Sequence, residues 1–145
     1  MHPVSFVGAG PGAEDLLTLR AARHLREADV LVWTDSLISP AIPALAPAHC
    51  ERIRTSNLTL EQVIPILISR QRDGKRVVRL HDGDTSLYSA INEQICALSD
   101  AGIAVDVVPG ISAYQAAAAG LSCELTIPGV VQTIVLGRAG GRTGV

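Results

Sequence analysis

Aromatic side chains are scarce in this chain, which has one tryptophan, one phenylalanine and two tyrosines among 145 residues. Because 48% of the residues are nevertheless hydrophobic, the core has to be built from aliphatic side chains and alanine. Runs of basic residues are also missing, and the net charge is −2, so nucleic acid is not an expected partner. The length predicts about one domain.

Long apolar runs are absent as well: no stretch of about 18 consecutive apolar residues exists, so no membrane span is predicted. We expect the first strand to begin by residue 4, which leaves no room for a signal peptide. Cysteine is sparse, and Cys50, Cys96 and Cys123 are odd in number and widely separated. This pattern favours buried thiols in a reducing cytoplasm over disulfides or a zinc site, and no metal is expected.

Glycine, by contrast, is well represented, and the most informative stretch runs from Val4 to Asp15. It opens as an apolar strand and then places glycines at positions 8, 10 and 12. Glycine reaches backbone angles closed to other residues and lets a ligand approach the main chain closely. In α/β proteins, such a strand and turn place a ligand at the carboxyl end of the first strand. The stretch therefore predicts a ligand site.

The glycine spacing also fits the fingerprint of dinucleotide-binding enzymes. The pattern Gly8-x-Gly10-x-x-Ala13 follows a strand, and Asp35 lies at about the distance of the acid that binds the ribose. An NAD(P)-dependent oxidoreductase is therefore one interpretation of the chain. A non-catalytic nucleotide-binding domain is another, and so is a glycine turn with no ligand.

Three residues of the turn argue against a pyrophosphate. Pro11 lacks the amide N–H that a phosphate would use. Glu14 and Asp15 place two carboxylates where the phosphates would lie, and like charges repel. The turn therefore suits a neutral or cationic nucleoside better.

Apolar runs and helical patterns alternate along the chain, which predicts an α/β fold with a mainly parallel five-stranded sheet and helices on both faces. The expected strands cover residues 4–7, 30–33, 51–54, 76–80 and 105–108, with a last strand over 130–136. The expected helices cover residues 18–28, 59–73, 86–100 and 113–120. We expect Leu19, Ala22 and Leu25 to form the buried stripe of the first helix. Pro65 should kink or shorten the second.

Ligands in such sheets bind outside the carboxyl ends of the strands. Three loops should meet there, and they read Val7-Gly8-Ala9-Gly10-Pro11-Gly12, Gly83-Asp84-Thr85-Ser86-Leu87-Tyr88 and Val108-Pro109-Gly110-Ile111-Ser112-Ala113. In order and spacing, these motifs resemble the tetrapyrrole methyltransferases that use S-adenosylmethionine, and the resemblance covers the whole chain. One departure is Thr85, where the family often has proline.

Finer features resemble the precorrin-4 or cobalt-precorrin-4 C11-methyltransferase branch of cobalamin synthesis. They are Asp35-Ser36-Leu37, His81, Glu124-Leu125-Thr126-Ile127-Pro128 and Gly141-Arg142-Thr143. The resemblance implies that residues 1–135 are an N-terminal α/β domain, and that residues 136–145 are a linker and the start of a second domain. It also implies a homodimer for the full-length enzyme and no methyl transfer by this piece alone.

The resemblance implies a cofactor site for S-adenosylmethionine, with S-adenosylhomocysteine as the product. Its residues would be Gly10, Pro11, Gly12, Asp82, Gly83, Asp84, Leu87, Ser112 and Ala113. A carboxylate such as Asp84 can accept hydrogen bonds from ribose hydroxyls or from the ammonium group. An alternative is that Asp84 only caps the next helix.

On the substrate side, the resemblance implies a tetrapyrrole, with or without cobalt. Asp35 is the candidate catalytic residue, contacting a pyrrole nitrogen or accepting a proton, although it could equally cap the segment after it. Arginine binds carboxylates through two parallel hydrogen bonds. The candidate substrate-binding residues are Ser36, Arg79, His81, Arg138 and Arg142.

Overall fold

The computed structural model describes residues 1–140, which form a five-stranded, all-parallel sheet in the order β3-β2-β4-β1-β5. The strands are β1 (Val4–Gly8), β2 (Val30–Trp33), β3 (Glu51–Arg54), β4 (Val77–His81) and β5 (Val105–Val108). The predicted α/β fold and five parallel strands are confirmed.

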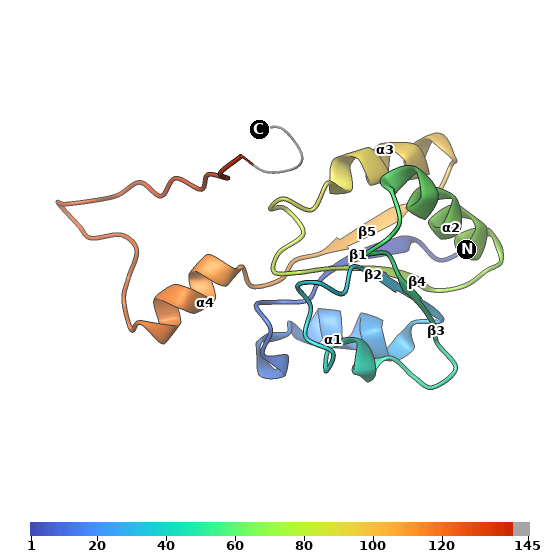
Figure 1. Ribbon diagram of the computed structural model, residues 1–145, viewed down its shortest axis with the longest axis horizontal. Helices are drawn as coiled ribbons and strands as arrows, with labels where there is room; N and C mark the ends of the chain where they lie inside the picture. The colour runs from blue at the N-terminus through green and yellow to red at the C-terminus, as the bar shows by residue number, and fades with distance from the viewer. Residues whose placement is uncertain (141–145) are drawn as a thin grey trace. The chain divides into compact units, whose positions relative to one another are not determined.

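Helices cover both faces of this sheet (Figure 1). The covering helices are α1 (Leu19–Glu27), α2 (Leu60–Arg72) and α3 (Ile91–Asp100), with short 3₁₀ turns η1 (Glu14–Leu16) and η2 (Pro43–Leu45). A fourth helix, α4 (Ala113–Gly120), follows β5 in the chain. The helix α1 packs on one face, and α2 and α3 pack on the other (Figure 1). The strands β1, β2 and β4 are buried along their whole length. Only β2 is a continuous apolar run, because Ser5 interrupts β1, and Arg79 and His81 lie in β4.

The burial of α1 differs from the predicted stripe. Thr18 caps the helix by accepting a hydrogen bond from the Ala21 N–H at 3.1 Å. Ala21 and Leu25 are fully buried, whereas Leu19 is 92% exposed, so the prediction for Leu19 was wrong. Residues four apart share a face of a helix, and at about 100° per residue Leu19 lies on the side opposite Ala21 and Leu25.

The helix α2 runs through Pro65 without being shortened. Thr59 and Gln62 form the capping box that fixes its first turn. The missing N–H of proline deprives only the carbonyl of Glu61, an exposed residue that water can reach. The expected shortening was therefore wrong.

The helix α3 begins at Ile91 and not at Ser86 as the sequence predicted. The five residues before it form turns in which Tyr88 and Ala90 have φ of 56° and 49°. The Ser89 hydroxyl donates to the Leu87 carbonyl at 3.1 Å. Such local hydrogen bonds compete with helix formation, which explains the late start.

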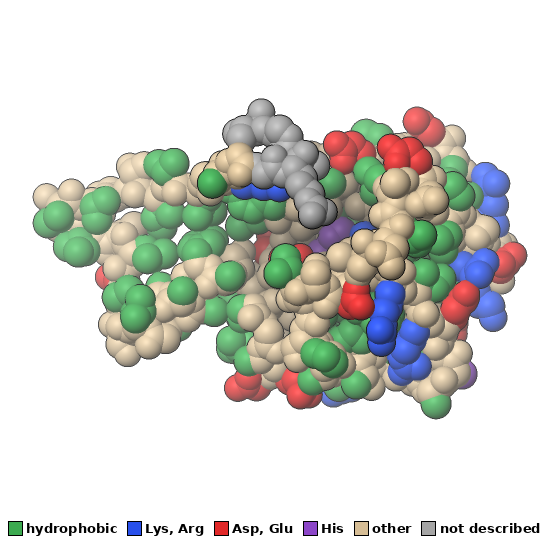
Figure 2. Space-filling view, in the orientation of Figure 1, with side chains coloured by type: hydrophobic (Ala, Val, Ile, Leu, Met, Phe, Trp, Pro, Cys, Tyr) green, Lys and Arg blue, Asp and Glu red, His purple; other side chains and the backbone are tan. Residues whose placement is uncertain are grey.

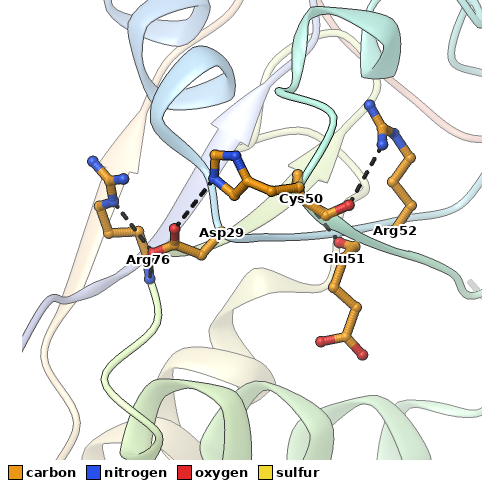
Figure 3. A network of polar contacts seen from close by, with 6 residues as sticks. Asp29, Cys50, Glu51, Arg52 and Arg76 are labelled. Carbon is orange, nitrogen blue, oxygen red and sulfur yellow. Dashed lines mark hydrogen bonds and ion pairs between the residues drawn. The ribbon is translucent and has the colours of Figure 1, made fainter.

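Ion pairs join the strands at their amino ends, away from the predicted ligand edge. The backbone N–H and the Nε of Arg76 donate to Asp29 Oδ2 at 2.9 and 3.3 Å (Figure 3). The hydrogen bond from this backbone N–H is the main reason that the pKa of Asp29 lies below its ordinary value. Glu51 binds Arg70 through two hydrogen bonds of 2.7 and 2.8 Å. These contacts link the start of β2 to the start of β4, and the start of β3 to α2.

Residues 114–145 form a second compact unit, separate from residues 1–113. Its described part contains most of α4 and a single antiparallel bridge between Ile127 and Val131. The strand predicted over residues 130–136 is not formed, and Val135 is 84% exposed. A strand needs a neighbour for its backbone groups, and beyond the bridge to Ile127 the described residues supply none. Hydrophobic side chains accordingly lie on the surface of this unit (Figure 2).

All three cysteines are free thiols, as predicted. Only Cys50 is buried, so the expected burial of Cys96 and Cys123 was wrong.

Within residues 1–140, no helix has the length and apolar character that crossing a membrane requires. No group of three or more His, Cys, Asp or Glu side chains in this range could hold a metal ion.

Candidate ligand site at the carboxyl edge of the sheet

Three glycines at the ends of neighbouring strands touch backbone to backbone. Gly8 ends β1, Gly83 follows β4 and Gly110 follows β5. A Cβ added to Gly8 would lie 2.7 Å from both the Gly110 nitrogen and the Gly83 oxygen. One added to Gly110 would lie 2.2 Å from the Gly83 oxygen. The contact therefore requires glycine, because no larger residue fits between these backbones.

The turns after β1 and β4 are also hydrogen-bonded to each other. The Gly10 N–H donates to the Gly83 carbonyl at 3.1 Å, and the Gly83 N–H donates to the Gly10 carbonyl at 2.9 Å. Both glycines have positive φ, 71° and 57°. Pro11 and Gly12 continue the first turn and are half-buried, and Gly12 has φ of 125°. The paired turns form a fixed rim on which a ligand can lie against the main chain.

The chain after Gly12 does not form the dinucleotide geometry. That fingerprint needs a helix whose N-terminus opens directly behind the glycines. Here the chain passes through the short turn η1, and α1 begins only at Leu19. Glu14 and Asp15 lie in η1 and are exposed.

Asp84 connects the turn after β4 to the turn after β5 through hydrogen bonds. Its Oδ1 accepts a hydrogen bond from the Gly110 N–H at 2.8 Å, and its Oδ2 accepts from the Ser86 N–H at 3.0 Å and from the Ser86 hydroxyl. Burial acts to raise the pKa of Asp84, but these hydrogen bonds outweigh it and hold the pKa below the ordinary value. Because α3 begins at Ile91, Asp84 is not its cap, and the capping alternative was wrong.

The other predicted cofactor residues surround this cluster with different exposure. A Cβ on Gly83 would lie 3.7 Å from the Ser112 Cα, so the segment after β5 lies beside the Gly83 turn. Ser112 is buried, Leu87 is half-buried, and Asp82 and Ala113 are exposed. The structure thus brings the three predicted loops together within residues 1–113. Cofactor contact by these side chains stays a prediction.

Two predicted substrate residues, Arg79 and His81, are buried at the carboxyl end of β4, each 7% exposed. The Arg79 guanidinium donates to Gln94 Oε1 and to Thr55 Oγ1, both at 3.3 Å. Both acceptors are neutral, and burial lowers the pKa of Arg79 to about 10. Substrate binding by Arg79 stays a prediction.

The His81 ring stacks on Phe6 with centroids 5.9 Å apart. Its Nε2 is buried without a hydrogen-bond partner among the described residues. Burial, with a smaller contribution from the Arg79 charge, lowers the pKa of His81 to about 3. The imidazole is therefore neutral at physiological pH.

The remaining candidates lie elsewhere. Asp35 and Ser36 follow β2 and are exposed, and Asp35 accepts a hydrogen bond from the Ser56 hydroxyl. The strand β4 lies between β2 and β1, which separates Asp35 from the Gly8 turn. Arg138 is an exposed residue of the second unit, and Arg142 lies outside the described residues.

Two polar residues of the buried layer, Thr55 and Gln94, were not predicted from the sequence. Gln94 carried a signal, because it lies three residues after Ile91 and four before Leu98, on the buried face of α3. Thr55 accepts from Arg79 and also shares a 2.9 Å hydrogen bond with Thr34. Nothing in the sequence around it indicated either contact.

A family model described as Tetrapyrrole (Corrin/Porphyrin) Methylases matches residues 3–144. The chain is 42% identical over 138 residues to a cobalt-precorrin-4 C(11)-methyltransferase of Priestia megaterium, covering 95% of this chain and 54% of that relative. It is 46% identical over 135 residues to a precorrin-4 C(11)-methyltransferase of Rhodococcus erythropolis, covering 93% of this chain and 54% of the relative. The chain thus spans about half the length of the relatives it matches.

Solved structures agree with these relatives. A cobalt precorrin-4 methyltransferase superposes with a TM-score of 0.93 at 42% identity, covering 98% of this chain and 59% of the other. A uroporphyrin-III C-methyltransferase of Thermus thermophilus, complexed with S-adenosylhomocysteine, superposes with a TM-score of 0.75 at 33% identity. That match covers 89% of this chain and 52% of the other.

Proposed function

The chain belongs to the tetrapyrrole (corrin/porphyrin) methylase family, and from that premise we propose that it carries the cofactor site of a precorrin-4 or cobalt-precorrin-4 C11-methyltransferase. The activity is the S-adenosylmethionine-dependent methylation of a tetrapyrrole in cobalamin synthesis. Because the chain spans about half of its relatives, we propose that residues 1–135 are the N-terminal domain, that residues 136–145 lead into a second domain, and that the whole enzyme is a cytoplasmic homodimer.

The observation that carries this proposal is the contact of three glycines at the ends of β1, β4 and β5. It leaves a rim of backbone against which the amino-acid end and the ribose of a nucleoside can lie. The rim lacks the amide of Pro11 and has Glu14 and Asp15 nearby, which suits a sulfonium better than a pyrophosphate. The residues present therefore fit S-adenosylmethionine.

Bound there, S-adenosylmethionine would supply the methyl group: a nucleophilic ring carbon would bond to the methyl carbon in line with the breaking C–S bond, and neutral S-adenosylhomocysteine would leave. The positive charge on sulfur disperses as the bond breaks, so strong binding of that charge would raise the barrier. The chain contributes mainly by position: the bridged turns of Gly10, Gly83 and Gly110 fix the donor, and misplacement of about 1 Å can cost about a hundredfold in rate.

On the pigment side, we propose Asp35 as the residue that contacts a pyrrole nitrogen, together with Ser36 beside it. Arg138 and Arg142 are proposed to bind substrate carboxylates. Arg79 and His81 would contribute from the buried carboxyl end of β4.

A ligand screen by thermal unfolding tests the cofactor. S-adenosylhomocysteine and S-adenosylmethionine are expected to raise the melting temperature, because a ligand that binds only the folded state stabilises it. NAD and NADP are expected to leave it unchanged. A shift with NAD or NADP, and none with the methyl donor, would refute the assignment.

Replacing Asp84 with alanine should weaken S-adenosylhomocysteine binding about tenfold, equivalent to about 1.4 kcal/mol. The substitution removes the acceptor for the Gly110 N–H and releases the turn after β5. Asp35→Ala should change the dissociation constant much less, since β4 separates Asp35 from the Gly8 turn. Isothermal titration calorimetry of both variants measures the two dissociation constants. A larger loss of affinity in Asp35→Ala than in Asp84→Ala would contradict the prediction.

A further inference from the structure

A cavity of about 460 Å³ lies at the carboxyl ends of β2 and β3. Its apolar wall includes Trp33, Ile38 and Pro43, which are all buried. The proline-rich segment after β2 forms this wall. The cavity belongs entirely to residues 1–113 and is separate from the contacting glycines.

Positive charge exceeds negative charge in the lining of this cavity, because two arginines, Arg52 and Arg54, accompany a single carboxylate, Asp35. The Arg52 guanidinium donates to the Ala46 carbonyl at 2.9 Å and to the Cys50 carbonyl at 3.4 Å, which fixes its position. These carbonyls carry no charge, so the charge of Arg52 remains. The cavity is therefore net positive.

Arg54 is the group in this cavity that can bind a ligand carboxylate. Its side chain is 72% exposed, and its guanidinium carbon lies 6.0 Å from the Trp33 ring centroid. Its ion pair with Asp35 is long, 3.8 Å, and exposed pairs of this kind contribute little. A carboxylate that binds Arg54 in a bidentate manner can therefore displace Asp35 at small cost.

We propose that this cavity binds one pyrrole ring of the substrate together with its carboxylate side chain. The ring lies against Trp33 and the proline-rich wall, and the carboxylate binds Arg54. This inference rests on the proposed function, because it takes the ligand to be a tetrapyrrole. Nothing in the motifs shared with the family pointed to Arg54.

The cavity lies close enough to the turns of Gly8, Gly83 and Gly110 for one ligand to contact both. The strands β2 and β1 are separated by β4 alone, so their ends are two strand spacings apart, about 10 Å. A tetrapyrrole macrocycle extends over such a distance. One ring held by Arg54 and Trp33 therefore leaves another ring over the turns of Gly8 and Gly83, where the methyl group would be presented.

The test uses porphobilinogen, a single pyrrole ring with an acetate and a propionate group, titrated into the millimolar range. Trp33 is the only tryptophan of the chain, so its fluorescence reports directly on this cavity. We expect a saturable change in wild type, at least tenfold weaker binding in Arg54→Met, and similar weakening in Ala44→Phe, which fills the cavity from an exposed position. Arg26→Met removes an exposed arginine of α1 and should bind like wild type.

S-adenosylhomocysteine binding, measured on the same variants by thermal shift, separates the two proposals. Arg54→Met should bind it like wild type. If S-adenosylhomocysteine binds but porphobilinogen gives no saturable signal, or binds Arg54→Met as tightly as wild type, the cavity proposal is wrong and the proposed function stands. If porphobilinogen binding depends on Arg54 but the methyl donor does not bind, the cavity proposal holds and the proposed cofactor site fails.

Discussion

Alanine at position 110 is expected to destabilise the folded chain by about 3 kcal/mol and to abolish S-adenosylhomocysteine binding. Its Cβ would lie 2.2 Å from the Gly83 oxygen and 3.0 Å from the Gly8 Cα. Both neighbours are backbone atoms of sheet ends, so no side-chain rotation relieves the clash. Overpacking at fixed sites costs 1–3 kcal/mol or more, and this site is at the upper end of that range. The strand ends would have to separate, which breaks the Asp84–Gly110 hydrogen bond.

Gly120→Ala is the matched control. A Cβ there meets nothing within 4 Å, and Gly120 lies at the end of α4. Urea unfolding and calorimetry on both variants give the comparison. If Gly110→Ala unfolds and binds like the control, the backbone contact is not what holds the site together.

Lowering the pH from 7 to 5 is expected to remove about 2 kcal/mol from the free energy of unfolding through His81 alone. The folded chain keeps this imidazole neutral because its pKa is lowered to about 3, while the unfolded chain titrates near 6.5. Between these values the unfolded state binds more protons, so stability falls as the pH falls. Each unit of pKa difference corresponds to about 1.4 kcal/mol.

His81→Phe retains a ring against Phe6 and removes the titrating group. Its unfolding free energy, from urea titrations at pH 7 and pH 5, should fall by about 2 kcal/mol less than that of wild type. His2→Phe, which makes the same replacement at an exposed histidine, is the matched control. A His81→Phe variant that loses as much stability as wild type would show that His81 is not held neutral in the fold.

The strands were predictable because burial on both faces leaves a simple trace in the sequence. Val30–Trp33 is an unbroken apolar run, and Ser5 alone interrupts the run before the first glycine turn; such runs are typical of a parallel sheet. The wrong predictions, for the start of α3 and for a strand over residues 130–136, have local causes. Leu87 and Ala90 extend the apolar pattern of α3 toward the N-terminus, yet Asp84 and Ser89 bind the backbone there and delay α3. The apolar run 130–136 has β-propensity, but propensity alone does not supply a neighbouring strand.

The sequence predicted which loops form the candidate site, but not the contacts that their side chains make. Glycines mark backbone that approaches closely, so the motifs indicated that the ends of β1, β4 and β5 meet. The role of Asp84 as a bridge to Gly110 depends on a partner 26 residues away, which no local pattern reports. Arg79 was predicted to bind a substrate carboxylate, and its burial was not predicted, because a charged residue is rarely buried without a carboxylate partner.

The strand order also affects how the chain is made. The strand β1 lies between β4 and β5, yet it precedes both in the sequence, and β4 begins only at Val77. At synthesis rates of 5–20 residues per second, the apolar segment Val4–Gly8 waits roughly 4–15 s for its first neighbour. During that time the nascent chain presents an unpaired strand, to which chaperones can bind. The central position that lets β1 carry the first glycine turn therefore makes it the part of the sheet most exposed to misassembly on the ribosome.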